Sequence, residues 1–406
     1  MADAVAHAAA EAAARDHYGR LVALVTRATG DPASAEDALA EAFAAALRVW
    51  PVTGVPDQPQ AWLLVAARRV AGKLRRHDKT HAAAAAALAQ LAAERAGTAP
   101  EVLGDARLRL LFLCAHPAIA SDIHTPLMLQ TVLGLDAARI GAAFLVPPAA
   151  MAQRLVRAKV KIRAAHIPFA LPDTRDLPAR LDAVLAAVHA AFTAGWDDVG
   201  LGQAGHGSLS AEAIFLARLL VAGMPDQPEA RGLLATMLFA EARAAARRGP
   251  DGRYVPMGQQ DPGLWRDDMI AAAEAELAAA SRLARPGRYQ TEAAIQSLHC
   301  ARAVPDAVRK RVLADLYAVL ESQAPVMGVR IARAVAVAGA GQVAAGLALL
   351  DGLDSVTMAA HQPWWAARAH LLAQMGQHAA ARDARDRAIA LARDPAVAAW
   401  LRTTGQ

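Results

Sequence analysis

The chain has 406 residues, 55% of them hydrophobic but only 4% aromatic, and its formal net charge is +5. Much of the hydrophobic fraction is alanine, which favours helix over strand, so we expect an all-α protein of two or three domains. Two cysteines exclude a disulfide framework. Neither a signal peptide nor a membrane-spanning stretch is expected, so we predict a soluble cytoplasmic protein without a membrane partner.

The first predicted unit begins with two helices joined by a tight turn. A helix pattern over Glu11–Ala28 is stopped by Gly30. Asp31 suits the N-cap of the next helix, and Pro32 suits its first turn, because proline has no N–H to leave unpaired there. We therefore expect the second helix to begin at Pro32.

This second helix has two faces with different chemistry, and Ser34 with Asp37 offers an alternative capping box at its start. A buried face is predicted at helical spacing: Ala35, Leu39, Ala42, Ala46 and Trp50. Asp37 and Glu41 lie on another, exposed face with Arg48. Negative charge cannot favour DNA, so this acidic face points to a protein partner, or it is ordinary surface charge.

A third helix is predicted after residues 51–59, a Pro- and Gly-rich segment that we expect to be a loop. The helix starts near Trp62 and ends in a basic cluster: Arg68, Arg69, Lys73, Arg75, Arg76 and Lys79. Aromatic side chains beside basic ones suit single-stranded or melted DNA, in which bases stack and phosphates pair with cations. The alternative is a solvated basic face.

Residues 81–103 are alanine-rich without a marked apolar period, and we interpret them as a linker between residues 1–80 and a second unit, residues 104–172. In that unit Cys114, His116 and His124 lie close in sequence. They lack the paired spacing of a structural zinc site, so we expect a buried structural role, with no metal and no cofactor.

The most informative local pattern is the stretch 135–163, which predicts a helix-turn-helix. A helix over 136–144 is followed by a short turn and by a second helix that begins near Pro148. An inward face is expected on this second helix: Met151, Leu155, Ala158 and Ile162.

The second helix also carries a basic face suited to DNA. The residues expected to contact DNA are Pro148, Ala149, Gln153, Arg154, Arg157 and Lys161, with Lys159 and Arg163 extending the charge. Neutralising phosphates drives much of DNA affinity, and Gln153 and Arg154 can make bidentate contacts with adenine and guanine. The alternative is a solvated basic helix face.

Residues 173–406 are predicted to form successive helices. Small and apolar residues within 363–395 lie close to tetratricopeptide spacing: Ala369, Leu372, Gly376, Ala381, Ala388 and Pro395. A weaker match to the same spacing lies at 332–353. Such helix pairs bind peptides or domains and rarely catalyse. We find no P-loop, dinucleotide fingerprint or nucleophile–base set and predict no enzyme, although Asp251, Asp261 and Trp265 in the loop 249–267 leave that alternative open.

The chain resembles the extracytoplasmic-function (ECF) sigma factors of RNA polymerase, most of all the ECF42-type group with a long tetratricopeptide-like C-terminal extension. The resemblance is carried by DPASAEDALAEAFAAALRVWP, GVPDQPQAWLLVAARRVAGKLRR, DARLRLLFLCAHPAIA, the helix-turn-helix, PDQPEARGLLATMLFAEARAAAR and GRYQTEAAIQSLH. It implies sigma region 2 at 1–80, region 4 at 104–172 and the extension at 173–406.

The resemblance also implies roles. Asp37, Glu41 and Phe43 would dock on the clamp helices of core RNA polymerase, whose β′ and β subunits offer the clamp and the flap. The loop 51–59 and the helix after it, with Trp62, would capture the melted −10 strand, and the helix from Pro148 would read the −35 element. The extension would regulate the factor, and it is a candidate for intramolecular contact with the sigma domains.

Two other functions fit parts of the pattern. A helix-turn-helix regulator with a helical sensing domain would act without core polymerase, but it would not need the residues 31–79. A tetratricopeptide-type scaffold with incidental basic helices would show negligible salt dependence of DNA binding.

Overall fold

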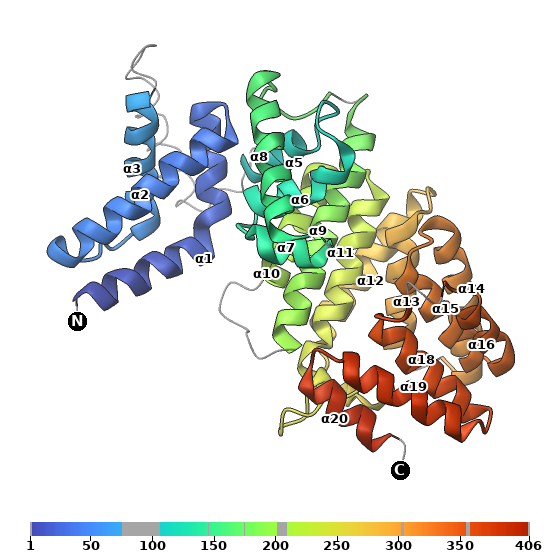
Figure 1. Ribbon diagram of the computed structural model, residues 1–406. Helices are drawn as coiled ribbons and strands as arrows, with labels where there is room; N and C mark the ends of the chain where they lie inside the picture. The colour runs from blue at the N-terminus through green and yellow to red at the C-terminus, as the bar shows by residue number, and fades with distance from the viewer. Residues whose placement is uncertain are drawn as a thin grey trace. The chain divides into compact units, whose positions relative to one another are not determined.

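The structure is a computed structural model. It describes residues 2–74, 106–144, 146–173, 175–200, 209–301, 304–354 and 358–404. The chain forms two compact units, Met1–Gly223 and Met224–Gln406 (Figure 1). Across these described ranges the regular elements are helices, and the β-type pairing there is an isolated bridge between Arg248 and Tyr254. The predicted all-α, multi-domain fold is confirmed.

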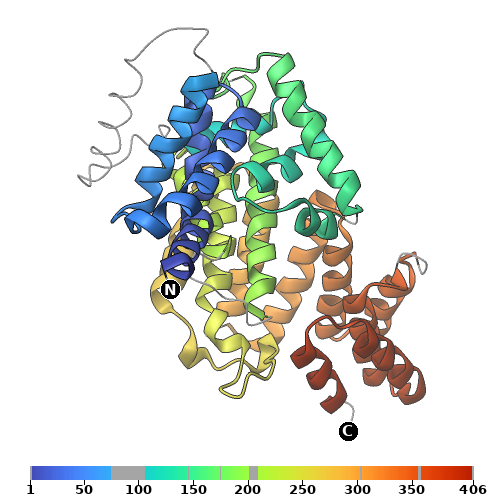
Figure 2. The ribbon, with the colours of Figure 1, turned by 60° about the vertical axis from the view of Figure 1, so that its left-hand side comes forward.

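The first three helices pack against one another as a bundle, drawn in blue in Figures 1 and 2: α1 (Ala2–Thr29), α2 (Pro32–Thr53) and α3 (Pro59–Leu74). We call them the N-terminal bundle. Asp31 caps α2 as predicted, because its carboxylate accepts from the Ala33 and Ser34 amides. The predicted inward face of α2 is buried, with Trp50 at 2% exposure.

Two boundaries in this bundle differ from the expectations. The first helix begins at Ala2 rather than Glu11, because an alanine-rich start sustains helix well before the apolar face begins. The expected loop 51–59 is shorter, since α2 continues through Pro51 to Thr53. A proline in the last turn disrupts one hydrogen bond only, and the helix ends at Thr53, followed by Gly54 with φ of 82°.

The rest of the first unit is a second group of helices, α5 (Ala106–Cys114), α6 (Ser121–Thr131), α7 (Ala137–Ala143), α8 (Pro148–Ala164), α9 (Leu177–Gly200) and α10 (Leu209–Gly223). We call α5–α10 the second half of unit 1. Its core includes Leu108, Phe112 and Leu127, all fully buried. The predicted inward face of α8 is buried as well: Met151, Leu155, Ala158 and Ile162.

Helix α9 is apolar enough over Leu177–Gly195 to pass a length-and-composition test for a membrane span. In the structure α9 packs against α6 and α10, and its Val184, Leu185 and Val188 are buried. A core helix of a water-exposed unit has the same composition, so the test alone does not indicate a membrane.

The second unit contains α11 (Pro228–Ala242), α12 (Asp267–Arg282), α13 (Arg288–Cys300), α14 (Asp306–Gln323), α15 (Met327–Gly339), α16 (Val343–Asp351), α18 (Gln362–Gln374), α19 (His378–Leu391) and α20 (Pro395–Thr403). Three short 3-10 turns lie between α11 and α12: η1 (Ala244–Arg247), η2 (Met257–Gln259) and η3 (Pro262–Leu264). Consecutive helices pack on one another: α11 on α12 and α13, α14 on α15, α15 on α16, and α18 on α19.

The small residues that suggested a repeat are placed at the α18–α19 crossing. Ala369, Ala381 and Ala388 are buried there, and Gly376 makes the turn with φ of 74°. Upstream, a Cβ at Gly346 would meet the Ala334 carbonyl at 2.5 Å, so α15 and α16 also approach closely. The helix pairs are therefore present, and their membership of the tetratricopeptide class stays a prediction.

The compact units and the domains predicted from sequence are divided at different points. Helices α9 and α10 belong to unit 1, where Arg107 of α5 pairs with Glu212 of α10 at 2.6 Å and covers the Phe215 ring. The sequence boundary at residue 172, with its linker at 81–103, stays a prediction, and residues 75–105 lie outside the described part of the chain.

Candidate nucleic-acid interface

A short, tightly packed turn joins α7 to α8. The Asp136 carboxylate caps α7 by accepting from the Arg139 amide at 2.8 Å. Gly141 lies so near the turn that a Cβ there would meet the Val146 carbonyl at 2.5 Å. Pro148 occupies the first turn of α8, where its missing N–H costs nothing. These local features join α7 to α8 by a short turn at the place where the sequence predicts a helix-turn-helix, and that assignment stays a prediction.

One side of α8 is exposed, and we call it the outer face. It carries all six residues predicted to contact DNA: Pro148, Ala149, Gln153, Arg154, Arg157 and Lys161. Arg157 donates to the Gln153 side chain at 3.3 Å, which orders two of these side chains along the helix. Arg154 lies 3.7 Å from Asp122 of α6, in a pair whose members are both largely exposed. Such a pair contributes little and leaves the guanidinium open to an anion.

The outer face has two members that the sequence reasoning missed. Val156 and Val160 are 60% and 57% exposed. They follow Gln153 and Arg157 by three residues each, so the helical spacing itself was the available signal. Exposed valines among basic residues suit the thymine methyl groups of a major groove, whereas Gln153 and the arginines suit base edges and phosphates.

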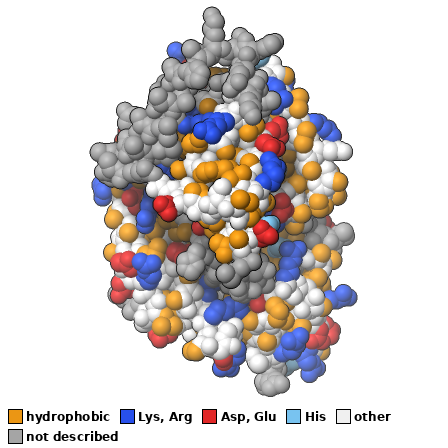
Figure 3. Space-filling view, turned by 90° about the vertical axis from the view of Figure 1, so that its left-hand side faces the viewer, with side chains coloured by type: hydrophobic (Ala, Val, Ile, Leu, Met, Phe, Trp, Pro, Cys, Tyr) orange, Lys and Arg blue, Asp and Glu red, His pale blue; other side chains and the backbone are white. Residues whose placement is uncertain are grey.

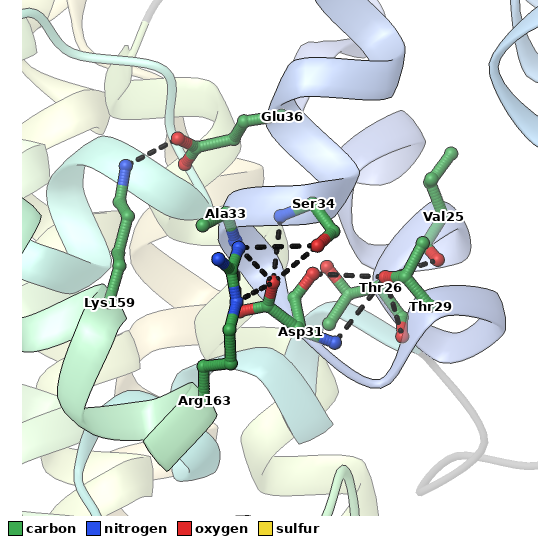
Figure 4. Close-up of polar contacts among 9 residues, drawn as sticks. All are labelled: Val25, Thr26, Thr29, Asp31, Ala33, Ser34, Glu36, Lys159 and Arg163. Atoms are coloured by element: carbon green, nitrogen blue, oxygen red, sulfur yellow. Dashed lines mark hydrogen bonds and ion pairs between the residues drawn. The ribbon is translucent and has the colours of Figure 1, made fainter. Parts of the chain in front are cut away.

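Lys159 and Arg163, which were expected to extend the charge of the outer face, both pair with carboxylates of α2 (Figure 4). Lys159 is buried, and its ammonium pairs with Glu36 of α2. The Arg163 guanidinium pairs with Asp31 at 2.7 Å. The expectation was wrong for Lys159, because α2 supplies a carboxylate that the local sequence does not reveal. For Arg163, whose side chain is 55% exposed, it stays a prediction.

The second predicted DNA-contacting group lies on α3, and part of it falls in the described residues. Trp62 is half-buried against Trp50, with ring centroids 5.5 Å apart in an edge-to-face arrangement. Arg69 is exposed. Arg68 is half-buried, and burial together with the nearby Arg27 charge lowers its pKa. Outside the described residues lie Arg75 and Arg76 and the side chain of Lys73.

The acidic face of α2 is exposed, as predicted. Asp37 and Glu41 are exposed and Phe43 is half-buried. Glu41 pairs with Arg48 at 3.3 Å on the same surface. Figure 3 views the side on which the N-terminal bundle lies in Figure 1, and apolar side chains gather in the upper part of that face. Exposed Val49 at the end of α2 adds to the apolar character, which suits a protein partner more than DNA.

Cys114, Asp251 and Asp261 make local contacts in the part of the chain that the structure describes. No group of three potential metal ligands occurs there. Cys114 is buried beside Thr131, with Sγ and Oγ1 3.3 Å apart, and burial raises the thiol pKa to about 12. Asp251 and Asp261 serve local turns, accepting from Arg253 and Gly263.

Comparison with known proteins adds the family context. Residues 13–80 match Sigma-70 region 2, and residues 180–281 match a family of unknown function, DUF6596. An uncharacterized protein of Rhizobium meliloti (strain 1021) is 37% identical over 374 residues, which cover 91% of this chain and 88% of that protein. No solved structure matches.

The Sigma-70 region 2 match lies on the N-terminal bundle that carries Trp62 and the acidic face of α2. Its family consists of non-enzymatic transcription factors and implies binding to core RNA polymerase and promoter DNA. The chain therefore belongs to one family with the Rhizobium meliloti protein, and its sigma-70 region 2 indicates a sigma-factor-like role in transcription initiation.

Proposed function

We propose that this protein is a sigma factor of the extracytoplasmic-function type, which binds core RNA polymerase and directs it to −35 and −10 promoter elements. The observation that supports this most is the combination, in one chain, of a match to Sigma-70 region 2 and a pair of consecutive helices, α7 and α8, with a basic and exposed outer face on α8. A regulator that acts without polymerase would have no use for region 2.

In this proposal α8 and α3 contact different promoter elements. The outer face of α8 reads the −35 element in the major groove, with arginines on guanines and phosphates and Gln153 on adenine. The α3 surface with Trp62, Arg68 and Arg69, continued by Lys73, Arg75 and Arg76, holds the melted −10 strand. Unstacking a base costs a few kcal/mol, and stacking on aromatic side chains offsets that cost.

The polymerase contact is assigned to α2. Asp37, Glu41 and Phe43 form the surface that docks on the clamp helices, and region 4 meets the flap. Exposed Asp37 and Glu41, with exposed Val49 on the same helix, support the assignment, because charged groups in an interface set orientation while apolar groups supply affinity.

The helices from residue 173 onward are proposed to form a tetratricopeptide-like regulatory extension that contacts the sigma domains. The packing of α9 and α10 on α5 and α6 supports such contact for the first part of it. A truncation should therefore remove residues 224–406, because a cut at residue 179 would strip α9 and α10 from the core of unit 1.

The test is transcription in vitro with purified core polymerase, followed by mapping of the start sites. We expect start sites that share −35 and −10 elements and depend on this protein. Removal of residues 224–406 should change the yield in either direction, and an unchanged yield would contradict a regulatory extension. DNA binding without any polymerase-dependent initiation would favour a helix-turn-helix regulator instead.

A further inference from the structure

A pocket of about 410 Å³ opens on unit 2, where α16, α18 and α19 meet. Much of its lining is apolar and comes from Leu353, Trp364, Trp365 and Leu372. Sites for small ligands have volumes in this range, and they are also mainly apolar with a few polar groups at fixed points. The pocket therefore has the size and lining of a binding site, and its polar groups decide which ligand it takes.

The two tryptophans of the pocket are held by hydrogen bonds to the backbone. Trp364 Nε1 donates to the Leu350 carbonyl at 3.1 Å, and Trp365 Nε1 donates to the Ala359 carbonyl at 3.1 Å. Their ring centroids lie 4.6 Å apart in an edge-to-face arrangement. Because both N–H groups are used within the protein, the rings are fixed in orientation and offer a ligand their π systems. Such a ring attracts a cation to its face.

One cation of the chain already uses this attraction. The Arg368 guanidinium carbon lies 5.3 Å from the centroid of the Trp364 ring, and the guanidinium pairs with Asp351 at the end of α16. The charge of Arg368 is therefore balanced within the lining of the pocket, and the Trp364 ring is occupied. Trp365 is half-buried, and its ring remains for a ligand.

The carboxylate that sets the charge of the pocket comes from α19. Asp383 lines the pocket and is exposed, and no cation among the described residues pairs with it. Because Asp351 and Arg368 balance each other, Asp383 leaves the pocket with a net negative charge. A carboxylate and an aromatic ring in one pocket suit an ammonium or guanidinium group, whereas an anionic ligand would be repelled.

A smaller pocket of about 220 Å³ adjoins the first, because Leu353 lines both. Its two charged residues come from α14 and α15 and pair with each other, with Glu321 Oε1 3.4 Å from Arg330 Nε. The charges of this second pocket are therefore balanced. Two adjoining pockets suit a ligand that continues beyond its cationic group as an uncharged chain.

We propose that the pocket between α16, α18 and α19 binds an alkylammonium or alkylguanidinium group, which pairs with Asp383 and stacks on Trp365. Arg368 is a positioning residue that covers Trp364. The group belongs to a free amine or to a lysine or arginine of a peptide whose chain continues past Leu353 into the smaller pocket. The site lies wholly in unit 2, so this inference goes beyond the proposed sigma-factor function, and its test needs neither polymerase nor DNA.

The test measures binding to the full-length protein by isothermal titration calorimetry. The ligands are butylguanidinium chloride and butylurea, its neutral isostere. We expect the cation to bind at least about tenfold more tightly, because only the cation gains from both the Asp383 carboxylate and the Trp365 ring. Equal binding of the two, or no binding of the cation at about 10 mM, would overturn the proposal.

Two variants on α19 separate this site from a general effect of charge. Asp383→Asn should weaken the binding of butylguanidinium at least about fivefold, because the paired carboxylate is lost. Asp386→Asn removes the same charge from an exposed position one turn away that does not line the pocket, and it should leave the affinity unchanged. Neither side chain is packed in the core, so both variants should fold. Equal losses in the two variants would overturn the site.

Two variants at Trp365 test the ring. Its side chain packs partly against the core of α15, α16, α18 and α19, so Trp365→Leu and Trp365→Phe both lose packing, while the phenylalanine alone keeps an aromatic face. Binding should fall in Trp365→Leu and be largely retained in Trp365→Phe. Wild-type affinity in Trp365→Leu, or an equal loss in both variants, would overturn the stacking on Trp365.

A peptide distinguishes the two sources of the cationic group. An acetylated and amidated pentapeptide with one central arginine among glycines is compared with butylguanidinium and with the same peptide carrying citrulline, the neutral isostere of arginine. Tighter binding of the arginine peptide than of butylguanidinium supports a peptide ligand, and weaker binding supports a free amine. Citrulline peptide that binds as tightly as the arginine peptide would overturn a site for cations.

Discussion

The outer face of α8 and its α2-facing flank carry the same chemistry and have different surroundings. Arg154, Arg157 and Lys161 are exposed, whereas Lys159 is buried against Glu36 and Arg163 is paired with Asp31. All five are basic residues within three turns of one helix. The difference shows that the role of a basic residue on a helix does not follow from its residue type. It depends on which groups the tertiary packing places beside it.

The two surfaces also differ in what a salt bridge contributes. The Arg154–Asp122 pair is exposed at 49% and 69%, so solvent screens it and an anion can replace Asp122. The Lys159–Glu36 pair is largely enclosed, so removing one partner leaves a desolvated charge behind. Breaking the first pair should therefore change DNA binding alone, whereas breaking the second should change how α8 packs on α2.

The largest effect is expected from reversing charge on the outer face. Arg154→Glu with Arg157→Glu should lower the affinity for a −35 duplex at least about 100-fold, because two phosphate or base contacts become repulsive. Fluorescence anisotropy at fixed salt measures this, with co-elution of core polymerase as the control that should not change. Retained DNA affinity would mean that α8 is not the recognition helix.

The next largest effect concerns the acidic face of α2 and its binding to core polymerase. Asp37→Lys with Glu41→Lys should weaken core polymerase association roughly tenfold, since two complementary charges on an interface are reversed. Affinity for a −35 duplex is the control that should not change, because neither residue lies on the outer face of α8. Co-elution measures the polymerase association, and an undiminished complex would remove α2 from the docking surface.

A smaller effect distinguishes the outer face of α8 from its α2-facing flank by the salt dependence of DNA binding. Arg157→Gln should reduce the slope of log K against log salt for DNA binding by about one, as expected for one lost phosphate contact. Arg163→Gln should reduce it less, because Asp31 already pairs with that guanidinium. Equal slopes in the two variants would show that Arg163 contacts phosphate as fully as the outer face does.

The smallest effect is a pH dependence of the Asp31 contact. Hydrogen bonds from Ser34 and the Arg163 charge outweigh burial and lower the Asp31 pKa. A lowered carboxyl pKa gives stability that is present above the ordinary aspartate value and is lost as the pH falls through the folded value. Asp31→Asn keeps a good N-cap, so its melting temperature should lie below that of the wild type at pH 6, and the difference should shrink as the pH falls below the ordinary aspartate pKa. Parallel curves would contradict this assignment.

Much of unit 1 was predictable from local pattern. The helical spacing of Ala35, Leu39 and Trp50 indicated a buried face, and Met151, Leu155 and Ile162 indicated another. Asp31 with Pro32 marked a helix start correctly, because capping depends on a few neighbouring atoms. Because of Pro51, the loop was predicted to begin too early. A proline in the last turn of a helix breaks fewer backbone hydrogen bonds than one in the helix interior.

The sequence by itself determined the all-α fold, the buried faces and the exposed basic face of α8, because helical period and side-chain chemistry are properties of adjacent residues. Only the tertiary structure decided that Lys159 and Arg163 meet Glu36 and Asp31, more than 120 residues away in the chain. The same is true of Gly19, whose missing Cβ matters only because Val132 lies against it. Contacts between distant segments depend on how whole helices pack, and no local pattern encodes them.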